Sequence, residues 1–508
     1  MRRTLPWAVF GLLTATQLGI GVWRTAVMLR GGLASGVRPL EWSTALGLDL
    51  LMCGLLAAAA WWWLPPRGPR SAAAWGARFL LLGWALLLVH YAWALATGRL
   101  APALTWAALA VFFSVGFRVR RLGNAPDDAA VSAAGSPAPA GERRAAIAIA
   151  ALFFIAQLPH LVVPYTFTDA KLIWACRAYR LAEQHALAGI LDCIDPARPP
   201  LHAVMLWLGV ADPTFEGRLL PLLMFGAFVL VFHQLLRRVA PRLAPWGVVW
   251  LLATDQVVKG QISSYSGVPE MLAVVVALAV IIDQRGVTGS RGVALALGVA
   301  AGAVTALLRR DGLPEFVLVS VVLLAVTRRW RDGFAWAPLA AAAVAYASWV
   351  FRPDALQSPP LFPPSLGASA GGAYQVPAAE PTFLEHMWTL VYGAQGQVLS
   401  HYGYGAFAWS WLIVTIWARR HAAGAAGERP TLASAATLFG VAGLAGWLAT
   451  LGAYAALTVL GHPHMSSLFV VRTGFGRHLV HFFPLCLLHA AARAERLVAA
   501  AAPVVPSR

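Results

Sequence analysis

Long apolar runs constrain the fold of this chain more than any other feature of its sequence. Windows of roughly 17–25 predominantly apolar residues recur along the chain, and each is long enough to cross a bilayer as a helix. Of the 508 residues, 59% are hydrophobic and only 12% are charged. A soluble globular chain carries about 25% charged residues. The sequence therefore predicts an all-α polytopic membrane protein.

Hydropathy predicts about 14 spans. They cover residues 7–28, 45–64, 78–97, 101–117, 145–164, 219–236, 245–262, 268–283, 292–308, 313–327, 334–350, 404–418, 434–459 and 478–492. The basic turns between alternate spans, such as "PPRGPR", "RRWRDG" and "ARRH", are expected in the cytoplasm with both termini, because Lys and Arg accumulate on that side. We therefore expect a multi-pass protein of the bacterial inner membrane.

The strong positive charge follows largely from the same rule. The formal net charge is +17, and blocks such as "RVRRLGN" can face anionic lipid headgroups, so no nucleic-acid partner is needed. The N-terminal twin arginine and apolar run imitate a signal peptide. Because no small-residue cleavage site follows closely, we favour an uncleaved first span.

The chain divides at a segment rich in Ala, Pro, Gly and Ser, which predicts a flexible cytoplasmic linker at residues 122–144. Residues 1–121 form a four-span N-terminal membrane block, in which we expect almost no polar residues and no site. Residues 145–492 form a larger membrane module, and residues 493–508 form a short cytoplasmic tail. The long segments lie on the outer side, which suggests that the function is carried out there.

The first long outer segment contains "TFTDAKLIWACRAYRLAEQ", in which Asp169 follows an apolar span. A helix that starts near Asp169 would bring Arg177 and Arg180 close to the face of this carboxylate. It would lie as an amphipathic helix along the outer membrane surface. Outer cations run against the positive-inside bias, and an anionic partner would explain them. The alternative is a solvated charged face without a ligand.

Further charges return to the outer side later in the chain. They are Lys259, Glu270, Arg309, Arg310, Asp311, Arg472 and Arg477. Carboxylates can activate a hydroxyl group or hold a divalent metal, and cations can bind a phosphate, Arg in bidentate fashion. A base beside phosphate-binding groups at the edge of a bilayer predicts a lipid-phosphate substrate.

Simpler interpretations stay open for several of these residues. Glu270 follows Pro269, where a carboxylate is stabilised by the helix dipole. Arg309 and Arg310 are alternatively the misplaced end of a span. His462 and His464 are either a metal-binding pair or part of a solvated loop.

The order of these segments resembles a known family. An aspartate after an apolar span precedes "RPPLHAVMLWLG", then "ATDQVVKGQISSYSGVPEML", "LLRRDGLP" and "GRHLVHFFPLCLLHAA". This order is similar to the GT-C class of membrane glycosyltransferases over about residues 145–492. Within that class it most resembles the protein mannosyltransferase and lipid A aminoarabinose transferase relatives of glycosyltransferase family 39.

The resemblance implies a GT-C-like multi-span helical bundle with amphipathic helices and loops on the extracytoplasmic face. It implies that Asp169 is the catalytic carboxylate, that Glu270 is a second acid, and that Arg198 lies under the active site. The donor would be a polyprenyl-phosphate sugar. Two features depart from the family. Ala170 and Lys171 stand where a second adjacent acid is usual, which disfavours a protein acceptor, and four extra spans precede the module.

The sequence thus predicts a glycosyltransferase of class EC 2.4 that inverts the anomeric centre. The expected catalytic residues are Asp169 and Glu270, and the expected substrate-binding residues are Lys171, Arg177, Arg180, Arg198, Lys259, Arg309, Arg310 and Arg477. The acceptor is left open between a lipid, a glycan and a protein. The cofactor is also left open, with a divalent metal as one option. The alternative functions are a transporter or flippase for a lipid-linked saccharide, and a scaffold.

Two of the four cysteines, Cys176 and Cys193, fall in the first outer segment. If that segment faces an oxidising compartment, the two can form a disulfide. The alternative is a pair of free thiols. Cys53 and Cys486 are expected inside spans as small apolar residues.

Overall fold

The computed structural model describes most of the chain. The described residues are 5–34, 44–64, 71–122, 139–161, 174–193, 198–208, 219–262, 266–283, 290–309, 312–353, 384, 388, 404–422, 434–460 and 476–501.

Helices make up the regular structure of these residues, with a single isolated β-bridge between Arg99 and Ala186. The first part of the chain contains α1 (Leu5–Ala34), α2 (Thr44–Trp62), α3 (Ala72–Thr97), α4 (Ala103–Leu122), α5 (Ala140–Ile155), η2 (Leu158–Leu161), α6 (Cys176–Gln184), η4 (Leu187–Asp192) and α7 (Leu201–Leu208). The middle contains α8 (Leu219–Val239), α9 (Ala244–Leu252), α10 (Asp255–Ile262), α11 (Gly267–Ile282), α12 (Arg291–Leu308), α13 (Gly312–Thr327) and α14 (Gly333–Val350). The last part contains α17 (Phe407–Ala422), α18 (Ala435–Leu460), α20 (Gly476–Leu479) and α21 (Phe483–Ala501). The all-helical expectation is confirmed.

Six of the described helices are long and apolar enough to cross a membrane. They are α1, α3, α8, α12, α14 and α18. Shorter apolar helices of 10–17 residues lie within α2, α4, α11, α13 and α17. These helices are consistent with a membrane protein. The number of about 14 spans stays a prediction.

Two of the segments expected as continuous spans are interrupted. The segment 245–262 breaks at Ala253 and Thr254 into α9 and α10, and the segment 478–492 contains a turn between α20 and α21. The helix α10 has 8 residues and carries Asp255 and Lys259, so it is too short and too polar to cross a bilayer. Both interruptions place polar side chains inside the helical bundle.

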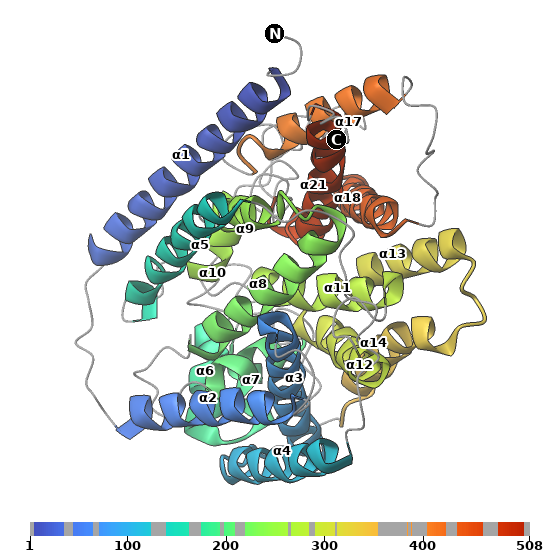
Figure 1. Cartoon of the computed structure of the whole chain (residues 1–508). Helices are drawn as coiled ribbons and strands as arrows, with labels where there is room; N and C mark the ends of the chain where they lie inside the picture. The colour runs from blue at the N-terminus through green and yellow to red at the C-terminus, as the bar shows by residue number, and fades with distance from the viewer. Residues whose placement is uncertain are drawn as a thin grey trace.

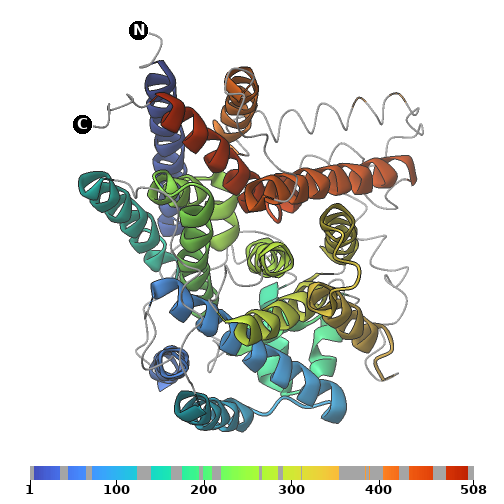
Figure 2. The same cartoon turned by 45° about the vertical axis from the view of Figure 1, so that its right-hand side comes forward.

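The N-terminal helices pack into the rest of the molecule. The helix α3 contacts α7, α8 and α12, and α1 contacts α9, α10 and α21. In Figure 1, α1 runs along one edge of the molecule, and in both views it passes close to α5 (Figure 1 and Figure 2). The expectation of an almost purely apolar block is wrong, because Asp49, Arg78 and His90 are buried in α2 and α3. Some of their polar groups form hydrogen bonds with nearby backbone. For example, Arg78 Nε donates to the Trp63 carbonyl over 3.0 Å.

Small residues allow the closest helix contacts. A Cβ atom added to Gly302 in α12 would lie 2.0 Å from the Pro338 carbonyl oxygen of α14. Only glycine permits this approach of two backbones, as is common where helices pack in membranes.

Candidate functional site

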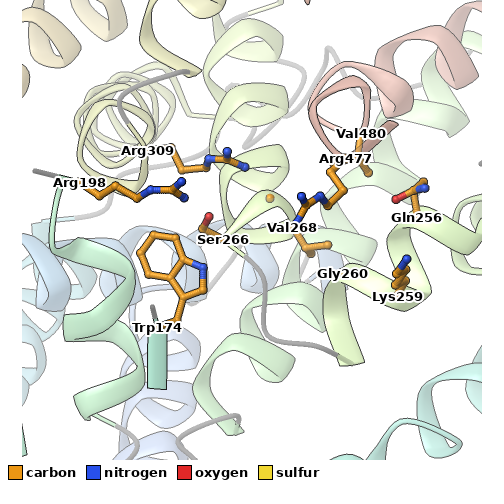
Figure 3. A pocket seen from close by; sticks show the side chains of 11 residues that line it. Trp174, Arg198, Gln256, Lys259, Gly260, Ser266, Val268, Arg309, Arg477 and Val480 are labelled. Carbon is orange, nitrogen blue, oxygen red and sulfur yellow. The ribbon is translucent and has the colours of Figure 1, made fainter. Parts of the chain in front are cut away.

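A cavity of about 70 Å³ lies where six segments of the chain meet. Its lining comes from one residue shortly before α6, one residue shortly before α7, the helix α10, the start of α11, the end of α12 and the segment around α20. The lining residues are Trp174, Arg198, Gln256, Lys259, Gly260, Ser266, Gly267, Val268, Arg309, Arg477 and Val480. Among these described residues four are cations and none is a carboxylate. Figure 3 shows Arg198 and Arg309 on one side, and Arg477 and Lys259 on the other.

The four cations were all predicted as substrate-binding residues, and the structure brings them to one cavity. They come from positions between 198 and 477 of the sequence, so only the fold places them together. The start of α11 also lines the cavity at Gly267 and Val268. The positive end of the helix dipole therefore adds to the field of the cations. The cavity is suited to an anionic group of about the size of a phosphate.

One wall is built around the Trp174 ring, which is almost completely buried. The guanidinium carbons of Arg177 and Arg198 lie 5.6 Å and 5.8 Å from the centre of this ring, as in cation–π contacts. Arg177 Nη1 also donates to the Arg198 carbonyl over 3.3 Å. Arg177 therefore holds the backbone that carries Arg198, and Arg198 faces the cavity.

The helix α6 corrects the expected arrangement of Arg177 and Arg180. The two were expected to share a polar face, but Arg177 is completely buried together with Ala178 and Leu181. The side chain of Arg180 is 45% exposed and pairs with Glu183 at 2.8 Å. The described helix begins at Cys176. Arg177 can be buried on its apolar face because its guanidinium contacts the Arg198 carbonyl and the Trp174 ring. Arg180 does not line the cavity.

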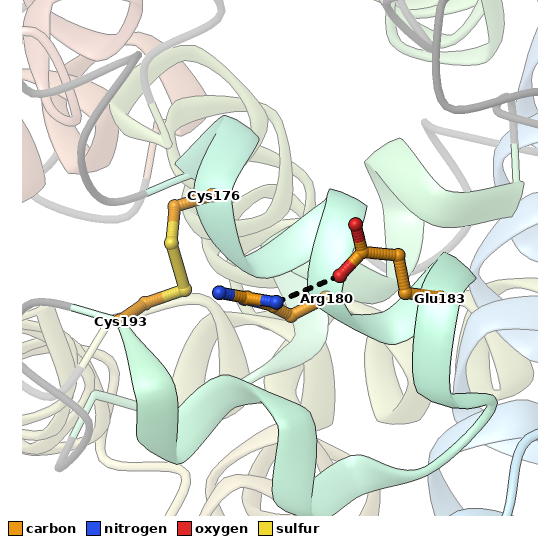
Figure 4. The surroundings of a disulfide bond; sticks show 4 residues. All are labelled: Cys176, Arg180, Glu183 and Cys193. Atoms are coloured by element: carbon orange, nitrogen blue, oxygen red, sulfur yellow. Dashed lines mark hydrogen bonds and ion pairs between the residues drawn. A yellow bond between two sulfur atoms is a disulfide. The ribbon is translucent and has the colours of Figure 1, made fainter.

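A disulfide between Cys176 and Cys193 joins the start of α6 to the end of η4 (Figure 4). The Cα atoms are 6.1 Å apart and the cysteines are 17 residues apart in sequence, so of the two alternatives that the sequence left open the disulfide is the one observed. On the chain-entropy estimate, a loop of this size contributes about 3 kcal/mol to folding stability. The bridge fixes the segment that begins with Trp174. Cys53 and Cys486 are buried and free, as predicted.

Behind the cavity lies a buried network of ionisable groups. Arg309, which lines the cavity, places Nε 3.8 Å from Glu270 Oε2 and donates from Nη2 to His478 Nε2 over 2.9 Å. His481 lies between two carboxylates, with Nε2 3.1 Å from Glu270 Oε2 and Nδ1 3.7 Å from Glu315 Oε2. Glu270 and His481 are completely buried. The network therefore orients Arg309 from behind.

Sequence reasoning identified Glu270 but missed Glu315 and His481, although a signal was present. The helices α11 and α13 both begin with the pattern Gly-x-Pro-Glu, at Gly267 to Glu270 and at Gly312 to Glu315. The pattern puts each carboxylate in the first turn of its helix, where the dipole stabilises it. His481 occurs in "GRHLVHFF", where a histidine stands among apolar residues. Glu270 therefore fits both interpretations: it lies in the first turn of α11, and it also contacts Arg309 and His481.

Two groups beside the cavity have shifted pKa values, and both lie outside the helices that are long enough to span. Burial disfavours the charged form of His481, but the carboxylates of Glu270 and Glu315 outweigh it and raise its pKa to about 9. For Lys259, burial lowers the pKa; Asp255 opposes this, and Arg477 and Arg24 add to it, so that the pKa lies below its usual value.

The described residues do not offer a site for a divalent metal. None of their His, Cys, Asp and Glu side chains gather in a group of three or more that could hold one. In the buried network His481 stands between Glu270 and Glu315, so its two ring nitrogens face different carboxylates instead of one shared point. We derive no step through a metal.

Several predicted residues lie outside the part of the chain that the structure describes. They are Asp169, Lys171, Arg310, Asp311, His462, His464 and Arg472. The described residues also add members that the sequence did not predict, namely Trp174, Gln256 and Ser266 in the lining of the cavity.

No protein-family profile, curated protein or solved structure matches this chain. The GT-C architecture therefore stays a prediction from the sequence. Function has to be inferred from the geometry of the cavity together with the resemblance of the sequence.

Proposed function

We propose that the protein is a glycosyltransferase that moves a sugar from a polyprenyl-phosphate donor to an acceptor hydroxyl on the extracytoplasmic face of a bacterial inner membrane. The finer fold that goes with this proposal is a GT-C-like bundle of about 14 spans. The observation that carries it is the cavity in which Arg198, Lys259, Arg309 and Arg477 converge, with no carboxylate among the described residues that line it.

The charge of the cavity and its surroundings favour a ligand that is a phosphate attached to a lipid. Four cations and a helix start can donate hydrogen bonds to phosphate oxygens, and the bonds from the cations would be charge-assisted and therefore strong. A second cavity, lined almost wholly by apolar side chains such as Trp84, Met205 and Met224, shares Val268 with the first. At about 10 Å³ this cavity is too small to hold an apolar chain, so the lipid tail would lie in the bilayer between helices while the phosphate is held by the cations. The disulfide between Cys176 and Cys193 supports an oxidising, extracytoplasmic location for this end of the bundle.

In the proposed reaction Asp169 takes the proton of the acceptor hydroxyl. The acceptor oxygen then attacks the anomeric carbon from the side opposite the phosphate, and the bond between this carbon and the phosphate oxygen breaks. The lipid phosphate leaves with the bonding electron pair, and its charge is stabilised by Arg309, Arg477 and the other cations of the cavity. Attack from the opposite side inverts the anomeric centre.

The test compares two substitutions that affect different steps. The purified protein is given a donor with a labelled sugar, and donor affinity and release of free polyprenyl phosphate are both measured. Arg477→Gln removes a phosphate ligand, so donor affinity is expected to fall about tenfold or more. Asp169→Asn removes the base, so the transfer rate is expected to fall roughly a hundredfold while donor affinity is kept.

A matched control for this test is Arg118→Gln, which changes an exposed arginine at the end of α4. It is expected to change neither quantity. If the wild-type protein releases no polyprenyl phosphate but moves the intact donor across vesicle membranes, the protein is a transporter and the proposal is wrong. Donor affinity that is unchanged in Arg477→Gln would remove the cavity from the donor site.

A further inference from the structure

The helix α1 approaches the cavity from outside the predicted catalytic module. It belongs to the four N-terminal spans that precede the region of family resemblance. It contacts α9 and α10, the two helices that replace one expected span. A Cβ atom added to Gly21 of α1 would lie 2.7 Å from the Cβ atom of Ala253, at the break between them. The contact is therefore too close for any residue but glycine.

Polar groups of α1 meet the same break. Gln17 Nε2 donates to Thr254 Oγ1 over 3.2 Å, and Trp250 Nε1 donates to Thr14 Oγ1 over 3.2 Å. Two turns further along α1, Arg24 Nε lies 3.2 Å from Oδ1 of Asp255, the first residue of α10. The side chains of Arg24 and Asp255 are 16% and 3% exposed, so this ion pair is largely shielded from water.

The ion pair stands next to a cation of the cavity. Asp255 and Lys259 are four residues apart in α10, which places them on the same face of the helix. Lys259 and Gln256 line the cavity. Among the described residues, the charged groups around Lys259 are Asp255 on its own helix, Arg24 on α1 and Arg477 on α20; Asp255 raises the pKa of Lys259, and the two arginines lower it.

We propose that Arg24 is a positioning residue of the cavity, which shares the charge of Asp255 with Lys259 so that this wall keeps a net positive charge for an anionic ligand. Arg24, Asp255 and Lys259 together carry one positive charge; without Arg24 the remaining two sum to zero. In this role of Arg24, the helix α1, which is the first of the four N-terminal spans, contributes to the site. The electrostatic inference stands alone, whereas the effect on a lipid phosphate rests on the proposed function.

The chain is well suited to a direct test because it contains only two lysines, Lys171 and Lys259. In a Lys171→Arg background, Lys259 is the only amine on a side chain. The rate at which an amine-selective reagent modifies it, followed by peptide mass spectrometry over a range of pH, gives its pKa without any ligand. Arg24→Gln is expected to raise that pKa by roughly half a unit or more, because a neighbouring positive charge is lost.

A second variant separates charge from structural support. In the double variant Arg24→Gln with Asp255→Asn, a positive and a negative neighbour are both lost, so the pKa of Lys259 is expected to return toward the wild-type value. If Arg24 only supports the position of α10, the double variant disturbs that position as much as the single variant does, and the pKa of Lys259 stays raised. Arg24→Lys keeps the charge and is expected to resemble the wild type. Arg30→Gln, an exposed arginine of the same helix, is the matched control.

Binding provides the link to function, with farnesyl phosphate as the probe. Its affinity for the protein in detergent is expected to fall about tenfold in Arg24→Gln and to recover in the double variant, which corresponds to about 1.4 kcal/mol. If the wild type does not bind this probe, the proposed function fails while the labelling result still decides the role of Arg24. An unchanged pKa of Lys259 in Arg24→Gln, or a raised pKa that the double variant does not restore, overturns the inference.

Discussion

On one side of the cavity, Glu270, His481 and Glu315 are completely or almost completely buried, whereas on the other side Lys259 stays partly exposed in a short helix. The buried side combines two carboxylates with Arg309 and a histidine that lies between the acids. On the open side, the part of the chain that the structure describes has one carboxylate, Asp255, among several cations. The first side is close to charge balance, and the second carries an excess of positive charge.

The difference indicates a division of roles between the two sides. A buried charge is tolerated only when it is paired and hydrogen-bonded, and removing one partner leaves the other uncompensated. The buried side is therefore expected to determine stability and the direction of Arg309. The open side is expected to determine the affinity for an anion. Each side can be disturbed separately.

The largest effect is expected from Glu270→Gln, which breaks the balance of the buried side. His481 and Arg309 both lose the nearest carboxylate, at 3.1 Å and 3.8 Å. Removing one partner of a buried ionic network costs about 3–5 kcal/mol of unfolding free energy. Thermal unfolding in detergent measures the loss.

Glu183→Gln serves as the matched control for that loss, because Glu183 pairs with Arg180 at the surface. It should change the unfolding free energy by less than about 1 kcal/mol. Equal losses in the two variants would remove the distinction between a buried and an exposed pair.

A smaller effect is expected from alkaline pH. The pKa of His481 is raised from its ordinary value to about 9, so the folded state binds this proton more tightly than the unfolded state. The resulting stabilisation is fully present below the ordinary pKa of histidine and is lost as the pH rises through about 9. The loss is on the order of 3 kcal/mol. Thermal unfolding measured between neutral and alkaline pH should show it.

The same titration in Glu270→Gln sharpens the comparison. Without this carboxylate the pKa of His481 is expected to fall, so the decline in stability above neutral pH should become shallower. A decline as steep as that of the wild type would mean that another group is responsible.

Much of the fold could be predicted from hydropathy alone, because long apolar runs have few options besides helices in a membrane. Helices occur within the expected segments, for example α12 at Arg291–Leu308 against a prediction of 292–308. The breaks in two segments were not predicted. A window average hides Asp255 and Lys259 among their apolar neighbours, and the buried contacts that hold α10 come from α1, more than two hundred residues away.

Residues of the site could be predicted where their charge alone marks them, but not where side-chain packing determines which way they face. Cations expected on the outer side run against the usual bias, and this identified Lys259, Arg309 and Arg477 before they were seen to line one cavity; Arg198 came from the family resemblance. The side that Arg177 faces depends on a carbonyl and a tryptophan ring that the helix meets in space. Helical periodicity places residues on a face, but it does not say which face the fold buries.

The smallest effect is expected at Arg180, which the sequence placed beside Arg177 as a donor-binding residue. Arg180 is 45% exposed, pairs with Glu183 and lies outside the lining of the cavity. An exposed pair three residues apart on a helix contributes less than about 1 kcal/mol. Arg180→Gln should therefore change neither donor affinity nor unfolding temperature measurably, whereas Arg198→Gln should weaken donor binding about tenfold. A loss of affinity in Arg180→Gln comparable to that in Arg198→Gln would show that the donor site extends beyond the cavity to the exposed face of α6.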